Sequence, residues 1–142
     1  MTGPAPLGPV DPFDLPEWLG EQAVTWHPEA GITGRPLVAG RLVSAQGEEQ
    51  PCDLLAVDEA YPGPVADDAA RTLAHQAWQH GQVHLADRRG RLTLAVPGRE
   101  FTADAVLAAL ARLALALGSS PARMSALLTV GRDGSSAASL AP

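Results

Sequence analysis

The sequence predicts a single α+β domain, built on an antiparallel or mixed sheet of about five strands with helices packed mainly on one face. With 142 residues, 46% of them hydrophobic and 18% charged, the chain can bury one core and is too short for two. Stretches of alternating apolar and polar residues are interspersed with longer stretches of helical periodicity. No internal repeat or change of composition divides residues 14–131. We therefore expect one domain there, between a proline-rich arm over residues 1–13 and a flexible tail over residues 132–142.

The first half of the domain is predicted to contain a short helix and three strands. Asp14, Pro16 and Glu17 form a helix-capping pattern, and Gly20 ends the helix. Alternation, or an unbroken apolar run, then indicates the strands. The predicted strands are residues 23–27, 37–44 and 52–58. In the third, four consecutive apolar residues from Leu54 indicate a central strand that is buried on both faces.

The second half of the domain is predicted to be mainly helical. The predicted elements are a helix over residues 68–80, a hairpin over residues 83–96, a helix over residues 101–118 and a short last helix after Pro121 with Met124, Leu127 and Leu128. Asp67 or Asp68 is the predicted N-cap of the first helix, and Thr102 that of the second. The predicted apolar face of the first helix consists of Ala70, Leu73, Ala74, Ala77 and Trp78.

Charge is distributed unevenly along the chain. The net charge is −6, but residues 1–68 contain twelve acidic residues and two arginines, whereas residues 69–142 contain four acidic residues and eight arginines. An acidic total argues against nucleic acid as the main partner, because neutralising phosphates requires a basic face. The asymmetry predicts that the two halves fold onto one another and place opposite charges side by side.

Cysteine usage and the lack of targeting signals predict a cytoplasmic protein. Cys52 is the only cysteine, so no intramolecular disulfide can form, and a lone thiol is typical of a reducing compartment. The first twelve residues lack the basic and apolar regions of a signal peptide, and no window is apolar enough to span a membrane. We expect no membrane partner.

The sequence predicts no catalytic residue, no metal and no cofactor. His75, His80 and His84, with Cys52 and Asp53, could supply zinc ligands, but their spacing does not suit a zinc site. Cys52 as a nucleophile would need an activating histidine, and a buried structural thiol is the expected alternative. The glycine-rich, phosphate-binding and serine-nucleophile motifs of common enzymes are missing.

Four segments resemble a family of small uncharacterised actinobacterial proteins. They are Asp11-Pro-Phe-Asp-Leu-Pro-Glu-Trp-Leu-Gly20, Cys52-Asp-Leu-Leu-Ala-Val-Asp58 with Tyr61-Pro62, His75-Gln-Ala-Trp78 with Gly81-Gln82-Val83, and Arg91-Leu-Thr-Leu-Ala-Val-Pro-Gly98. The resemblance spans about residues 11–131. It implies no activity, cofactor or catalytic residue, and it agrees with the alanine-rich, lysine-free composition of a protein encoded by GC-rich DNA.

We expect a non-enzymatic protein-interaction domain. The 101–118 helix is apolar around more than one stripe, which indicates either a position inside the core or a second face for another subunit. A homodimer through this helix is one form of the hypothesis. The candidate interface residues are Trp18, Leu110, Arg112 and Leu113.

Two other functions remain open at this stage. One is a small-molecule-binding protein or enzyme with a cleft near Tyr61 and His75, for which Asp58, His84 and Cys52 are further candidates. The other is nucleic-acid binding by the arginine-rich hairpin turn over residues 88–91, which the net charge of −6 disfavours.

Overall fold

The computed structural model describes residues 7–11, 14–29, 36–58, 66–129 and 135–139. The strands are β1 (Gly8–Pro9), β2 (Val24–Pro28), β3 (Leu37–Val38), β4 (Gly40–Ser44), β5 (Glu49–Ala56), β6 (His84–Arg88), β7 (Arg91–Val96), β8 (Met124–Thr129) and β9 (Ser135–Ser139). The helices are α1 (Trp18–Glu21), α2 (Asp68–Gln79) and α3 (Ala103–Ala116), with a 3-10 turn at Pro121–Arg123.

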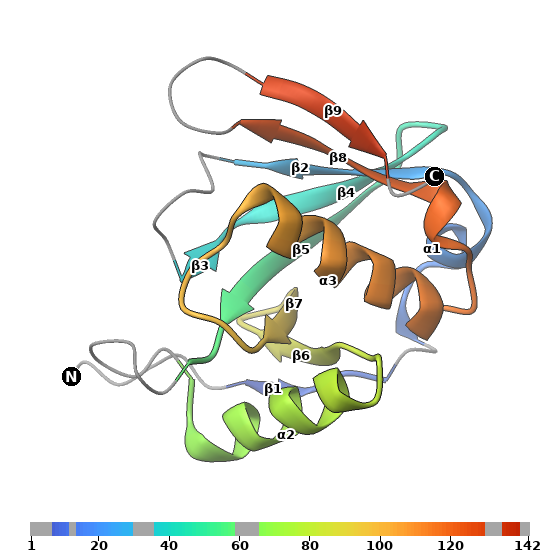
Figure 1. Ribbon diagram of the computed structural model, residues 1–142. Helices are drawn as coiled ribbons and strands as arrows, with labels where there is room; N and C mark the ends of the chain where they lie inside the picture. The colour runs from blue at the N-terminus through green and yellow to red at the C-terminus, as the bar shows by residue number, and fades with distance from the viewer. Residues whose placement is uncertain (1–6, 12–13, 30–35, 59–65, 130–134, 140–142) are drawn as a thin grey trace.

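The strands form one mixed sheet, which confirms the α+β class. Its order is β1-β6-β7-β5-β4-β2-β8-β9, and β3 also pairs with β5 (Figure 1). The pairs β5–β7 and β2–β8 are parallel, whereas the other pairs are antiparallel. Eight strands lie along this path instead of the predicted five or so. The additional strands β1, β8 and β9 come from segments predicted as an arm, a helix and a tail.

Strand β8 replaces the predicted last helix. The serine and proline before it do start a helical turn, but that turn ends at Arg123. From Met124 the chain pairs in parallel with β2. Met124 and Ala126 are buried and Ser125 between them is half-buried, which is the period of two expected for a strand. Long-range pairing therefore overrides the local helix-start signal.

The two ends of the described chain also join the sheet. Gly8 and Pro9 pair with Asp87 and Ala86 of β6, so part of the predicted arm forms an edge strand. Strand β9 pairs antiparallel with β8, so part of the tail predicted over residues 132–142 forms a strand. The sequences of β1 and β9 lack the alternating pattern that is typical of a strand. Each is extended because it pairs with its neighbour in the sheet.

The helices α2 and α3 cover opposite faces of the central strands, whereas α1 packs in the same cluster as α3. In Figure 1, α3 lies in front of the sheet and α2 lies beneath its lower strands. Leu54 and Leu94 belong to the cluster that includes α3, whereas the next residues, Leu55 and Ala95, belong to the cluster that includes α2. Consecutive residues of a strand point to opposite faces, so one strand serves both clusters. The unbroken apolar run of β5 is explained by this double burial.

Both long helices begin and end as the sequence predicts. The side chains of Asp67 and Thr102 accept hydrogen bonds from the backbone N–H groups of Ala70 and Ala105, at 2.7 and 3.2 Å. The glycine that follows each helix, Gly81 or Gly118, has a positive φ angle, which suits the residue just past a helix end. The caps therefore set where α2 and α3 begin and end along the chain.

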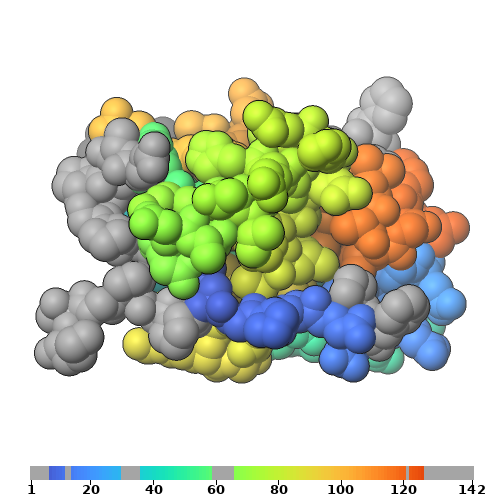
Figure 2. Space-filling view, turned by 90° about the horizontal axis from the view of Figure 1, so that it is seen from below, coloured from blue at the N-terminus to red at the C-terminus, as the bar shows by residue number. Residues whose placement is uncertain are grey.

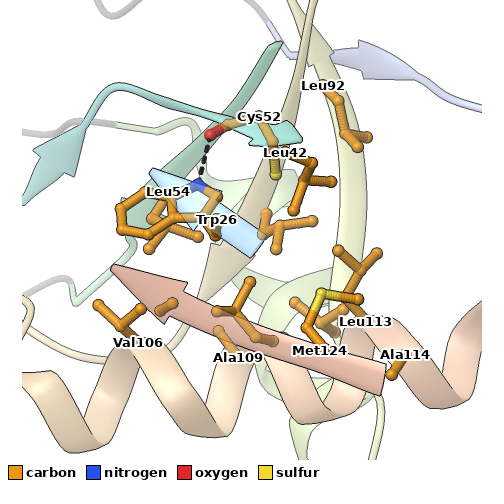
Figure 3. Packing of buried hydrophobic residues seen from close by; sticks show 14 of the residues in the cluster. Trp26, Leu42, Cys52, Leu54, Leu92, Val106, Ala109, Leu113, Ala114 and Met124 are labelled. Carbon is orange, nitrogen blue, oxygen red and sulfur yellow. Dashed lines mark hydrogen bonds between the residues drawn. The ribbon is translucent and has the colours of Figure 1, made fainter. Parts of the chain in front are cut away.

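The larger core cluster is centred on Trp26 (Figure 3). The indole Nε1 of Trp26 donates a 2.9 Å hydrogen bond to the backbone oxygen of Cys52. The ring passes directly over Gly40, where a Cβ atom would lie 2.5 Å from Cζ2 of the indole. Only glycine can therefore occupy this position without displacing β2 or β4. The Cys52 side chain is fully buried in the same cluster, as predicted for a structural thiol.

Candidate functional site

The predicted interface residues of α3 lie in the core. Leu110 and Leu113 are fully buried against the sheet, and Trp18 of α1 is only 8% exposed. These side chains are therefore not on a surface that a second subunit could contact. One stripe of α3, which includes Leu110 and Leu113, is therefore buried in the core, whereas Leu115 of the same helix is 58% exposed.

Arg112 is also used within the chain. Its guanidinium lies 3.4 Å from the centre of the Trp78 ring and stacks on it. Its Nη1 donates hydrogen bonds to the backbone oxygens of Trp78 at 2.6 Å and Gln82 at 3.3 Å. Burial lowers the pKa of Arg112. Arg112 thus joins α3 to the end of α2.

The ligand-site candidates are not brought together. Cys52 lies on the α3 side of the sheet, and burial raises the pKa of its thiol, with a further rise from the Asp53 carboxylate, so it is a poor nucleophile. Asp58 has its Oδ2 3.8 Å from Nε of Arg99. His75 is exposed on α2, whereas His84 is partly buried at the start of β6. Tyr61 lies outside the described residues.

Neither a cluster of metal-ligand side chains nor a membrane-spanning helix is found in the described part of the chain. Within it, no group of three or more His, Cys, Asp or Glu side chains is placed to hold a metal ion. The histidines and Cys52 named above as zinc candidates are thus not assembled into a site. None of the described helices is both long enough and apolar enough to cross a bilayer.

A buried ion cluster forms on the α2 side of the sheet around Asp53, whose side chain is 1% exposed. Nε and Nη2 of Arg91 each lie 2.9 Å from a different carboxylate oxygen. Nη1 of Arg88 lies 3.5 Å from Oδ2, and the backbone N–H of Gly40 donates to Oδ1 at 3.2 Å. Arg91 Nη2 also contacts Oε2 of Glu29 at 3.3 Å. Hydrogen bonding to Asp53 raises the pKa of Arg91.

This cluster joins the acidic half of the chain to the basic half, as the charge asymmetry predicts. Asp53 and Glu29 come from the first half and Arg88 and Arg91 from the second. Both oxygens of Asp53 have hydrogen-bond donors, so the carboxylate is engaged in holding strands together and is not available as a base or a ligand. The same contacts engage two of the arginines proposed for nucleic-acid binding. Asp53 was detectable in the sequence as an acid followed directly by the unbroken apolar run from Leu54.

An open groove lies between α2 and the edge of the sheet. Figure 2 looks onto this face, where α2 (green) and β1 (blue) lie on either side of the chain entering β6, with the end of α3 (orange) beside them. The groove has a volume of about 830 Å³. Its lining comprises Pro9, Val10, Leu73, Gln76, Ala77, Gln79, His80, Gln82, Val83, His84, Leu85 and Ala116. No carboxylate and no arginine is among these residues, so the lining is apolar with neutral amides and two histidines.

Of the two large hydrophobic side chains most exposed in the described residues, one lies at this groove. Leu73, which lines it, is 47% exposed, and Leu115, which precedes the lining residue Ala116, is 58% exposed. Leu73 was predicted to lie on the buried face of α2. Instead, α2 packs through the small residues Ala70 and Ala74, and Leu73 is left at the rim.

Partial burial of His84 in the groove predicts a pH-dependent stability. Burial lowers the pKa of His84, so the folded chain binds this proton more weakly than the unfolded chain does. The resulting stability is present above about pH 6.5, the ordinary histidine pKa, and decreases as the pH falls through the lowered value. We expect the free energy of unfolding to drop between about pH 7 and pH 5, and H84Q to reduce that drop.

Urea denaturation at several pH values measures this effect. Burial, followed by the charge of Arg41, also lowers the pKa of His27, so H27Q is a matched comparison from the opposite part of the sheet. The two substitutions are expected to reduce the slope additively, because the histidines do not share a partner. An H84Q slope equal to that of the wild type would contradict the assignment.

Comparison with known proteins found no match: no family model, no curated protein and no solved structure matches the chain. The resemblance to small actinobacterial proteins stays a prediction.

Proposed function

We propose that this chain is a protein-interaction domain that binds its partner through the groove between α2, β1 and β6. One observation carries the proposal: Leu73, one of the two large hydrophobic side chains left exposed in the described residues, lines this groove. Single exposed leucines are ordinary on protein surfaces. An exposed leucine that lines an apolar hollow resembles the centre of an interface, where apolar groups become buried when the partner binds.

The composition of the groove supports binding in preference to catalysis. The glutamines at its rim can exchange hydrogen bonds with a partner backbone without the cost of burying a charge. The lining contains neither a carboxylate pair nor a nucleophile next to a base. His80 is committed locally, with its Nδ1 2.8 Å from the backbone oxygen of Gln76.

A small-molecule site near His75 is the second candidate. His75 lines a hollow of about 450 Å³ on the outer side of α2, together with Asp68, Arg71 and Thr72. Asp68 and Arg71 form an ion pair with each other. This hollow is polar and lies along a single helix, whereas ligand pockets are usually enclosed and mostly apolar. We therefore rank this hollow below the groove as a candidate binding site.

The test combines crosslinking with a purified partner. A photoreactive residue at position 73 of the full chain, in the cells that produce it, is expected to crosslink one protein repeatedly, and the same residue at position 72 is the matched control. With that protein purified, L73D is expected to weaken binding by about 10- to 100-fold in calorimetry, because a buried leucine contributes about 1.5–3 kcal/mol. T72D is expected to bind as the wild type does.

Three results separate the alternatives. Equal binding by L73D and wild type would contradict the groove as the interface. A crosslink to a second copy, with a dimer in sedimentation velocity that L73D dissociates, would make the domain homodimeric. A small molecule retained at stoichiometric level in native mass spectrometry, and lost in H75Q but not in L73D, would favour the second candidate.

A further inference from the structure

A second hollow lies on the other side of β1 from the groove. Its volume is about 320 Å³. Its lining comprises Gly8, Pro9, Val10, Asp11, Asp14, Leu15, Gln50, Asp87, Gly90 and Leu92. Pro9 and Val10 line both the hollow and the groove, so only β1 and the residue after it separate the two. A single bound segment could cross this narrow ridge and occupy both.

The hollow is acidic where the groove is uncharged. Asp11, Asp14 and Asp87 contribute to its lining, and no basic residue is among the lining residues. The strand alternation of β6 explains part of this separation. Asp87 points to the hollow side, whereas its neighbour Arg88 points to the opposite face and contacts Asp53. The fold thus directs an arginine away from the hollow and keeps a carboxylate at it.

We infer, on the basis of the function proposed above, that the partner is a protein segment whose apolar side chains fill the groove and whose adjacent basic side chain enters the acidic hollow. Complementary charge favours such a segment over a second copy of this chain. A second copy has the same net charge of −6, and the copies would repel one another at long range.

The edge strand favours recognition through side chains. β1 contains only two residues, and Pro9 has no backbone N–H to donate to an added strand. Strand addition at this edge of the described sheet would therefore gain few backbone hydrogen bonds. A partner would instead be bound through its side chains, with apolar groups in the groove and a basic group in the acidic hollow.

Synthetic peptides test the inference directly on the full-length chain. The probes are peptides of about nine residues with the same leucine-rich stretch, ending in two arginines, two glutamines or two glutamates. Binding is followed by amide chemical shifts of the isotope-labelled chain at about 50 mM and about 500 mM salt, because a tenfold rise in ionic strength shortens the Debye length about threefold. The arginine peptide is expected to bind about five- to tenfold more tightly than the glutamine peptide at low salt, and this preference should shrink at high salt.

Substitutions in the hollow supply the matched control. D14N/D87N is expected to remove the preference for arginine and to leave binding of the glutamine peptide unchanged. Asn at position 87 keeps an oxygen for the backbone N–H of Gly90, which Asp87 accepts at 3.4 Å, so the hairpin turn is preserved. D104N removes a charge from the exposed first turn of α3 and should retain the preference.

The possible failures are distinguishable. If all three peptides shift groove amides with equal affinity, the inference about the basic residue is wrong and the proposed interaction groove stands. If D104N removes the preference as well as D14N/D87N does, the effect is one of net charge and the hollow is not the site. If no peptide shifts the amides of α2 and β6, both the inference and the groove as a peptide-binding surface are wrong.

Discussion

Replacing Arg91 by leucine is expected to destabilise the fold by about 3–5 kcal/mol, because it leaves the carboxylate of Asp53 buried without its main partner. The backbone oxygen of Gly40 loses a donor in the same variant. Denaturation by guanidinium, followed by tryptophan fluorescence, measures the change in the free energy of unfolding.

Two variants complete this test. R88L removes the same charge from the neighbouring strand, but its single contact with Asp53 is 3.5 Å long, so its effect should be much smaller. In D53L/R91L both charges are gone, and much of the stability lost in R91L should return, because no ion remains buried alone. An R91L variant within about 1 kcal/mol of the wild type would show that Arg88 or water compensates the carboxylate.

Replacing Gly40 by alanine is expected to cost about 2–4 kcal/mol, although only one methyl group is added. The new Cβ would lie 2.5 Å and 2.6 Å from two carbons of the Trp26 indole and 2.8 Å from the backbone oxygen of His27. Neither neighbour is the free end of a flexible chain, since the indole is fully buried and the oxygen belongs to the paired strand β2. Thermal and guanidinium denaturation measure the loss.

The controls separate the clash from a general effect of losing glycine. G8A lies in another strand, where the nearest atom to the new Cβ is 3.9 Å away, so it should change stability little. In G40A/W26F the smaller ring gives the methyl group room, and the double variant should be less destabilised than the sum of the single variants. Additive losses would show that the Trp26 ring does not cause the strain.

Local signals predicted both long helices and the hairpin turn, but the capping pattern from Asp14 to Gly20 was wrong, because α1 spans Trp18–Glu21 and includes Gly20. Asp67 and Thr102 cap their helices, and the hairpin turn before Arg91 forms where the turn residues lie, with positive φ at Arg89 and Gly90. The other predictions that were wrong concern elements whose conformation depends on distant partners. Strand β8 begins three residues after Pro121, and only pairing with β2 decides that it is extended. The apolar run of β5 revealed burial on both faces but not which helix covers which.

The candidate site was harder to predict for a related reason. Leu73 has the helical spacing of a core residue, alongside Ala70, Ala74 and Ala77. Sequence periodicity shows which residues share a face of a helix, but not how far the helix is rotated against its sheet. The paired alanines allow close packing, and this rotation leaves Leu73 at the rim of the groove. Leu110 shows the converse, because an apolar helix predicted as an interface is covered by its own chain.

The parallel pairing of β2 with β8 also has a consequence for how the chain acquires its structure. Val24 and Met124 are partners across the sheet, and so are Thr25 and Ser125, although about a hundred residues separate them along the chain. During synthesis this end of the sheet cannot form until the residues of β8 have left the ribosome. Until then, β2, which carries the buried Trp26, is paired with β4 but lacks β8 at its other edge. Folding is therefore governed by contacts between distant residues, which are slow to form because the intervening chain must first be brought into a closed loop.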